Sequence, residues 1–384
     1  MCRNGKVYSV DARAALARHT EEGLRLEETS HKYDRIVAYI REQIETKQLG
    51  YGDRIPTENE LIRRFSVSRF TVRKAVEQLA KQGMLEQRRG SGTFVKNVNS
   101  KKVRTNTVGI LTTYMDDYIF PNIIRSIEGV LTQQGYSITL GITGNKVEKE
   151  RLCLRSMLQH EVDGLIIEAT KSALPNPNLD LLRQFSEKNI PAIFLHSRYD
   201  AFESSFVMMD DEHAGFLAGE HLIRCGHTKI AAVMKSDDMQ GHRRYQGFLR
   251  SLYAHDLHLD ESAVVWYTTE DMPDLLDGAL DSVLLRRFSG STAVLCYNDQ
   301  IALKTIRLFE RGGLSVPQDF SVMGFDDSDL CRLSSVKLTS VGQAQREEIG
   351  SIAAHGLLEL IGGGKPIRRL LPPRLAVRDS VRTL

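Results

Sequence analysis

The chain has 384 residues, of which 41% are hydrophobic and 26% are charged, and this composition excludes wholesale disorder. Because one hydrophobic core stops growing at about 250–300 residues, at least two domains are expected. No apolar run approaches the ~20 residues of a membrane span, and residues 1–20 lack the apolar core of a signal peptide, so we expect a cytoplasmic protein.

The net charge of +2 is unevenly distributed along the chain. Residues 32–102 hold 16 Lys and Arg against 8 Asp and Glu, whereas residues 103–384 hold 30 against 36. A compact basic segment joined to a mildly acidic body indicates nucleic-acid binding at one end. The five cysteines are odd in number and include no C-x-x-C pair, which argues against a disulfide framework or a zinc ribbon.

The basic segment begins with three predicted helices, after an N-terminal extension (1–31) to which we assign no function. Ile36, Ile40 and Ile44 form an apolar stripe at helical spacing. Thr57 with Glu60 three residues later predicts the start of a second, short helix. Ser68 predicts the cap of a third helix, whose inward positions are Val72, Ala75, Val76 and Leu79.

A β-hairpin is expected after the third helix. The run 84–89 is followed by Gly90-Ser91-Gly92 and by Thr93-Phe94-Val95, so two short strands flank a glycine turn. Three helices and a hairpin in about 65 residues predict an α+β winged helix-turn-helix domain over 32–96. Residues 97–106 lack apolar periodicity and are predicted to be a linker.

Residues 107–384 alternate apolar strands with amphipathic helices, which is typical of parallel sheets buried on both faces. Nine strands are too many for one small sheet. We therefore predict an α/β body of two doubly wound subdomains, which fits this number of strands better than a (β/α)₈ barrel does. Periodicity alone does not distinguish the two folds. The strands are Val108–Tyr114, Ile138–Thr143, Val162–Ala169, Ala192–His196, Phe206–Met209, Ile230–Met234, Val264–Tyr267, Ala293–Tyr297 and Ser321–Phe325.

Basic residues gather at two places suited to DNA. Arg69, Phe70, Arg73 and Lys74 point outward near the start of the third helix, where a recognition helix reads base edges. Thr71 and the backbone N–H groups of that helix start suit a phosphate. Arg88 and Arg89 beside the glycine turn suit a minor-groove or phosphate contact. A simpler explanation is that these arginines form a solvated charged surface with no partner. It could account for any one arginine, but it does not account for all of them lying on one helix-and-wing unit.

Residues 32–95 resemble the GntR-type winged-helix DNA-binding domains. The motifs are Ile55-Pro56-Thr57-Glu58-Asn59-Glu60-Leu61, Val67 to Ala75 and Gly90 to Val95. This resemblance implies that the recognition helix contacts DNA through Arg69, Thr71 and Arg73 and the wing through Arg89 and Gly90. It also places Glu58 at the start of the helix-turn-helix and Lys32 near the DNA backbone.

The body resembles the LacI-type sugar-responsive repressors, which are built on the type I periplasmic-binding-protein fold. Matching pieces include Val162-Asp163-Gly164-Leu165-Ile166-Ile167, Arg244-Tyr245-Gln246-Gly247-Phe248, Cys296-Tyr297-Asn298-Asp299-Gln300 and Gly324-Phe325-Asp326-Asp327. A GntR-type head on such a body resembles the arabinose-metabolism repressors of Gram-positive bacteria.

A sugar site needs amide and acidic groups for the hydroxyls, a guanidinium and apolar rings. In doubly wound sheets these groups lie at the carboxyl ends of the strands. The resemblance makes Arg244 and Asp299 the leading ligand contacts. Asp326 and Asp327 could line the cleft, but a strand-end cap is the favoured role. The full candidate set is Tyr118, Phe120, Glu168, Lys171, His196, Asp211, Arg244, Asn298 and Asp299.

The sequence offers little for catalysis. No metal site is expected, because the His-Glu-x-x-His spacing of zinc proteases is missing from the acids and histidines of Asp211-Glu212-His213 and Glu220-His221. Gly362-Gly363-Gly364-Lys365-Pro366 has proline where a phosphate-binding loop needs Ser or Thr. No cofactor is predicted, and a sugar kinase or isomerase carrying a DNA-binding head is disfavoured.

These features and the resemblances imply a homodimeric repressor that binds double-stranded operator DNA and is released by L-arabinose. One winged helix offers a small interface, so two linked half-sites are expected. An alternative keeps the fold but changes the effector to another pentose, a hexose or a phosphorylated sugar, which could also act as a corepressor.

Overall fold

The computed structural model describes residues 33–44, 46, 48–50, 52–88, 91–95, 104–115, 119–343 and 347–384. The chain divides into two compact units, Met1–Val103 and Arg104–Leu384, which we name the head and the effector domain. The last residues of the predicted linker are bonded within the effector domain, because the Thr105 and Asn106 N–H groups donate to Asp163. Residues 1–31 and 97–103 lie outside the described residues.

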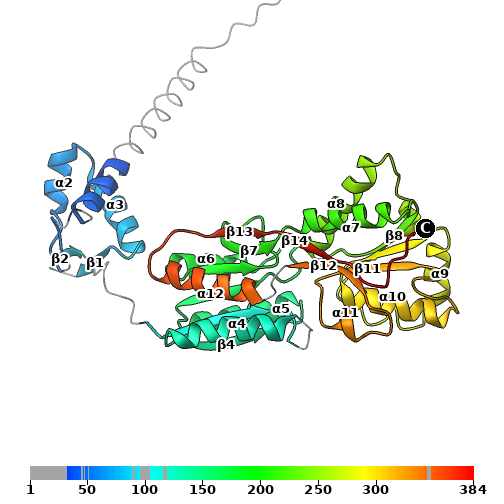
Figure 1. Ribbon diagram of the computed structural model, residues 1–384. Coiled ribbons are helices and arrows are strands. Elements are labelled where there is room, and N and C mark those ends of the chain that lie inside the picture. Colours follow the sequence, from blue (N-terminus) through cyan, green and yellow to red (C-terminus); the bar gives the residue numbers. More distant parts are fainter. Residues whose placement is uncertain are drawn as a thin grey trace, which may run out of the picture. The chain divides into compact units, whose positions relative to one another are not determined.

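The head consists of helices followed by an antiparallel hairpin (Figure 1). A helix over residues 33–44 precedes α2 (Glu58–Phe65), α3 (Arg69–Lys81), β1 (Leu85–Arg88) and β2 (Gly92–Val95). Thr57 and Glu60 form the expected capping box at α2. Ser68 caps α3 by accepting from the Thr71 N–H group. The predicted winged helix-turn-helix is therefore confirmed.

The apolar stripes of the three helices meet in one core. Ile36, Ile40, Leu61, Val72 and Leu79 are fully buried, as their spacing predicts. Residues 52–55 also pair with β2, through an isolated bridge between Arg54 and Phe94, which the sequence did not indicate. Helix packing and this extra pairing together hold α3 against the wing.

The effector domain contains two six-stranded sheets (Figure 1). The first has the strand order β13-β7-β6-β5-β3-β4, and the second has β14-β12-β11-β10-β8-β9. All their pairings are parallel except that of β14 with β12. The strands are β3 (Thr107–Thr112), β4 (Ser137–Ile142), β5 (Gly164–Glu168), β6 (Ala192–Leu195), β7 (Ser205–Met209), β8 (Ile230–Lys235), β9 (Val264–Tyr267), β10 (Ala293–Cys296), β11 (Ser321–Phe325), β12 (Thr339–Gln343), β13 (Arg368–Leu371) and β14 (Pro373–Ala376).

Helices cover both faces of the first sheet, as buried parallel strands require. Apolar residues of α4 and α12 pack on one face, and those of α5 and α6 pack on the other. In the second lobe, α7 and α8 lie together on one side of the sheet, with α9 and α10 on the other (Figure 1). The helices are α4 (Phe120–Gln133), α5 (Val147–Gln159), α6 (Leu179–Glu187), α7 (Asp211–Arg224), α8 (Met239–Ala254), α9 (Asp281–Phe288), α10 (Asp299–Arg311), α11 (Leu330–Leu333) and α12 (Glu347–Ile361).

The nine predicted strands are all present, and the two-sheet arrangement replaces the barrel alternative. Three further strands, β12, β13 and β14, were not predicted from the sequence. The chain passes between the lobes after β7, after β12 and between β13 and β14, where only Pro372 separates the two strands. These three passages, which we name the hinges, connect the two lobes. None of the described helices is long and apolar enough to cross a membrane.

Candidate DNA-binding surface and effector cleft

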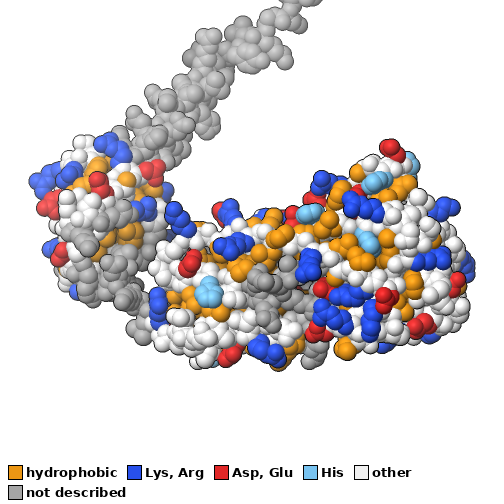
Figure 2. Space-filling model, in the orientation of Figure 1, with side chains coloured by type: hydrophobic (Ala, Val, Ile, Leu, Met, Phe, Trp, Pro, Cys, Tyr) orange, Lys and Arg blue, Asp and Glu red, His pale blue; other side chains and the backbone are white. Residues whose placement is uncertain are grey.

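The outward face of α3 carries the predicted DNA contacts. Arg69, Phe70 and Arg73 are exposed, and basic side chains recur over the face of the head that Figure 2 shows. The Glu58 carboxylate lies beside both arginines, because Arg73 Nε donates to it at 3.0 Å and Arg69 Nε lies 3.7 Å away. Arg69 also donates to Asn59 Oδ1 at 3.1 Å. Glu58 therefore holds the two guanidinium groups on one side of the helix.

Thr71 does not share this exposed surface. Its side chain is buried, and its hydroxyl lies 2.8 Å from the Ser68 hydroxyl. Its N–H group already donates to Ser68 at 3.1 Å, so a phosphate that used the Thr71 N–H group would have to replace that cap. Lys32, Arg89 and Gly90 lie outside the described residues, and their DNA contacts stay predictions.

A cavity of about 540 Å³ lies between the two lobes of the effector domain, within the usual size range of small-molecule sites. Its walls come from the carboxyl ends of the strands in both sheets, as expected for doubly wound folds. The predicted candidates Phe120, Glu168, His196, Arg244 and Asn298 all line it. Tyr118 lies outside the described residues.

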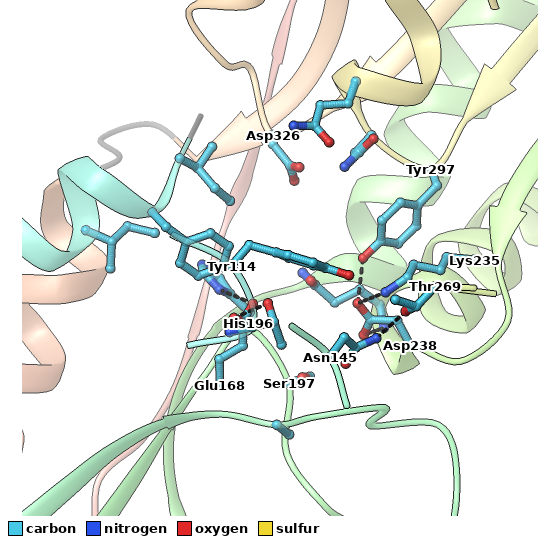
Figure 3. A pocket seen from close by; sticks show the side chains of 18 of the residues that line it. Tyr114, Asn145, Glu168, His196, Ser197, Lys235, Asp238, Thr269, Tyr297 and Asp326 are labelled. Atoms are coloured by element: carbon cyan, nitrogen blue, oxygen red, sulfur yellow. Dashed lines mark hydrogen bonds and ion pairs between the residues drawn. The ribbon is translucent and has the colours of Figure 1, made fainter. Parts of the chain in front are cut away.

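The first lobe contributes a linked acid and imidazole (Figure 3). Glu168 accepts from the N–H group and the hydroxyl of Thr113 at 2.7 and 2.5 Å. His196 Nδ1 lies 3.5 Å from Glu168, and the Phe120 ring meets the His196 ring edge-on at 5.5 Å. Burial alone would lower the pKa of His196, but its bond to Glu168 and the nearby carboxylates raise that pKa.

The second lobe contributes a buried guanidinium. Arg244 donates to Asp211 at 2.8 Å, to the Tyr297 carbonyl at 2.7 Å and to Asp326 at 3.0 Å. Although burial opposes the charge, the two carboxylates raise the pKa of Arg244, so the guanidinium stays charged. Asp326 lines the cavity and is thus more than the strand-end cap that the sequence favoured.

Two glycines bring Arg244 to this position. A Cβ at Gly215 of α7 would lie 1.9 Å from the Arg244 carbonyl oxygen, and one at Gly247 of α8 would lie 1.8 Å from the Glu212 carbonyl oxygen. Side chains at either glycine would therefore force α7 and α8 apart. The close crossing sets Asp211, at the start of α7, beside Arg244.

The structure adds lining residues that the sequence analysis missed. Asp238 accepts from the Tyr297 hydroxyl at 2.6 Å, and Lys235 Nζ lies 3.9 Å from the same carboxylate (Figure 3). Lys235 is the last residue of β8 and Asp238 follows that strand, so the strand-end rule that selected Glu168 could have found them. Tyr297 lies within the Tyr-Asn-Asp-Gln motif. Tyr114 and Tyr267 supply further rings.

Three predicted contacts lie behind the lining or beside it. Asp211 and Asp299 are buried and do not line the cavity. Asp299 accepts from the Ser340 hydroxyl at 2.6 Å and from the Ser328 N–H group at 2.7 Å, which ties α10 to β12. Lys171 instead reaches across the cleft to Asp237 at 3.2 Å and Glu270 at 2.7 Å. These residues support the site without forming its surface.

Strand-end residues at the cleft adopt unusual backbone conformations. Asn145, Lys171, His196 and Asp326 have φ values of 54°, 45°, 61° and 90°, in a region that side chains other than glycine rarely adopt. Such strain clusters at functional sites, where the surrounding structure maintains it. Of these four side chains, Asn145 and Lys171 bond to residues of the opposite lobe. His196 and Asp326 bond within their own lobes, to Glu168 and Arg244.

Asp299 should make stability pH-dependent. Burial, together with the charge of Asp326, raises its pKa to about 7, against an ordinary value of 3.8. The stabilisation is then complete below about pH 4 and is lost as pH rises through 7. We therefore expect the unfolding midpoint of Asp299→Asn to rise relative to that of the native protein as the pH is raised from 5 to 8.5.

The matched control for that measurement is Asp281→Asn, since Arg311 lowers the pKa of Asp281 and its titration falls below the window. If the unfolding midpoints of Asp299→Asn and the native protein changed in parallel with pH, the raised pKa of Asp299 would be contradicted.

Comparisons with known proteins agree with both halves of the chain. Residues 32–95 match the model of bacterial regulatory proteins of the gntR family, and residues 220–381 match the periplasmic binding protein-like domain. The arabinose metabolism transcriptional repressor of Geobacillus stearothermophilus is 38% identical over 366 residues, covering 93% of this chain and all of the relative.

A second relative and one solved structure extend this agreement. The arabinose metabolism transcriptional repressor of Halalkalibacterium halodurans is 35% identical over 360 residues, covering 89% of this chain and 95% of the relative. A LacI family transcriptional regulator from Enterococcus faecium with bound ribose is 27% identical, with a TM-score of 0.58, covering 72% of this chain and 99% of that one. The matches confirm the predicted combination of head and body.

Proposed function

This chain belongs to the family of arabinose metabolism transcriptional repressors, and we propose that it represses arabinose-utilisation genes by binding operator DNA as a homodimer. L-Arabinose in the interlobe cleft releases it from the operator. The family consists of regulators rather than enzymes. One observation carries the proposal: a single chain combines an exposed recognition helix with a sugar-sized cavity.

The chemistry of the cavity supports a neutral sugar. Carboxylates at Glu168, Asp238 and Asp326 can accept from hydroxyl groups, and Lys235 and Arg244 can donate to them. The rings of Phe120, Tyr114, Tyr267 and Tyr297 offer apolar faces for sugar C–H groups. Because the charged lining groups of both signs are already paired with one another, a free phosphate would have to compete with carboxylates. This disfavours a phosphorylated sugar.

Release requires that sugar and operator favour different arrangements of the effector domain. Contacts across the cleft support this requirement: Ser172 donates to Asp238 at 2.8 Å, and Asn145 donates to Thr269 at 2.6 Å. Together with the ion pairs of Lys171, they bridge the lobes beside the cavity. We propose that the sugar strengthens this bridged state, which the hinges transmit to the heads.

The proposal is tested with an operator enriched from a random duplex library by the full-length protein. Fluorescence anisotropy should give salt-dependent binding, and L-arabinose should weaken it while D-xylose, D-ribose and D-glucose do not. A thermal-shift screen of the same sugars supplies an independent readout. Failure to enrich any duplex, or equal responses to all the sugars, would refute the function or the effector respectively.

Replacing Lys171 with methionine should weaken L-arabinose binding without altering the cavity wall. The ammonium joins the lobes through Asp237 and Glu270, so its loss makes closure less favourable and lowers sugar affinity. By calorimetry we expect a loss of about tenfold, since partly buried charge-assisted bonds contribute ~1.5–3 kcal/mol.

Arg151→Met is the matched control, because Arg151 pairs with Asp180 within the first lobe and neither residue lines the cavity. Unchanged affinity in Lys171→Met would show that the bridge does not contribute to sugar binding.

A further inference from the structure

One apolar side chain on the head lacks an explanation in its fold. Phe70 is 74% exposed, and among the described residues of the head it is the only large apolar side chain that stays mostly exposed. The buried side of α3 is formed by Thr71, Val72, Ala75, Val76 and Leu79. The Phe70 ring therefore contributes nothing to the core and is free to contact a partner, so its place on the helix decides what it serves.

The position of Phe70 on α3 identifies the surface it serves. At ~100° per residue, Phe70 lies about 170° from the centre of the buried arc, so it occupies the middle of the outward face. It is the second residue of α3, near the helix end that enters the major groove in helix-turn-helix proteins. Arg73 and Lys74 lie on either side of it.

The neighbouring charges make the partner an acidic polymer, not a second apolar protein surface. Arg69 and Arg73 have side chains about 60% exposed. Lys74 leans away, with its Nζ 5.7 Å from the Tyr33 ring centre. A phenyl ring surrounded by guanidinium groups suits DNA, where the arginines contact phosphates or guanine edges.

The major groove presents one apolar group on a base edge, the C5-methyl of thymine. We infer that Phe70 packs against a thymine methyl in each operator half-site and so reads that base pair. This inference rests on the proposed DNA-binding function. Phe70 thus determines specificity through an apolar contact with the methyl group, where the arginines of α3 would read bases through hydrogen bonds.

Deoxyuridine scanning tests this inference, because deoxyuridine differs from thymidine only by the missing methyl group. The operator enriched by the full-length protein is made with each thymine of one half-site replaced singly. For the native protein we expect about fourfold weaker binding at one position, as for exposing one methyl-sized group. Phe70→Ser should bind the unmodified operator more weakly and show no further loss at that position.

Two controls separate this result from other causes. Tyr253→Ser removes an aromatic ring that is 61% exposed in the effector domain and should keep the deoxyuridine sensitivity. Arg73→Ala should bind weakly yet still lose about fourfold at the same thymine.

Three outcomes would overturn the inference. In the first, the native protein binds every deoxyuridine-containing operator as tightly as the unmodified one. In the second, Phe70→Ser loses as much affinity as the native protein at the same deoxyuridine. In the third, Phe70→Ser lowers the affinity equally for the operator and for unrelated duplexes. The last would place the ring against the DNA backbone. If the library yields no preferred duplex, the proposed function fails and this inference fails with it. Enrichment of an operator that tolerates deoxyuridine rejects the inference alone.

Discussion

Replacing Arg244 with alanine should lower the free energy of unfolding of the effector domain by about 3–5 kcal/mol, the usual cost of removing one partner from a buried ion pair. The Arg244 side chain is 2% exposed, as is that of Asp211. Its removal takes the guanidinium charge away from Asp211 and Asp326 and removes a donor from the Tyr297 carbonyl. Because native domains are stable by only about 5–15 kcal/mol, this is a large fraction of the total.

The same substitution should abolish sugar binding, since Arg244 lines the cavity. Thermal unfolding should show a midpoint lowered by on the order of 10 °C, and calorimetry below that midpoint should show no heat from L-arabinose. Arg244→Lys keeps the charge but cannot make three directed contacts. Its unfolding midpoint should therefore lie between those of Arg244→Ala and the native protein.

Arg250→Ala is the matched control, because Arg250 also lies on α8 and pairs with Glu212 but has a side chain 63% exposed. An exposed pair contributes at most about 1 kcal/mol. If the two substitutions lowered the free energy of unfolding equally, the buried network around Arg244 would contribute no more to stability than an exposed ion pair.

Arg73→Ala should reduce operator affinity by about 1–3 kcal/mol for each half-site, the value of a bidentate arginine contact to guanine. Arg73 lies on the outward face of α3, and Glu58 fixes its guanidinium at 3.0 Å. Because the side chain is 60% exposed, the substitution should leave the unfolding temperature nearly unchanged. Fluorescence anisotropy at fixed salt should show the loss on the operator and a smaller one on unrelated DNA.

The control is Lys81→Ala, which removes an exposed charge from the last turn of the same helix. If Arg73→Ala weakened binding to operator and unrelated DNA equally, Arg73 would be a phosphate contact and would not read a base.

The glycines at the α7–α8 crossing illustrate what sequence reasoning could not reach. Gly215 belonged to no motif, and Gly247 was noted only as part of the Arg244 to Phe248 motif. Yet their missing side chains let two helices approach and place Arg244 on Asp211. The strands β13 and β14 were missed for a related reason, since both lie at sheet edges with exposed or half-buried residues. Their sequences therefore carry no alternation of buried and exposed positions.

The sequence alone determined the architecture, because burial imposes a period on the chain wherever an element has an apolar face. It located the helices of the head, nine strands of the body and five of the cavity-lining candidates. Tertiary structure decided which polar groups meet. Asp299 turned inward to serve α10 and β12, Lys171 became a bridge between lobes, and Lys235, Asp238 and Tyr297 joined the cavity. Such assignments depend on side-chain directions and on which strand ends face one another, and these follow from the packing of residues far apart in the chain.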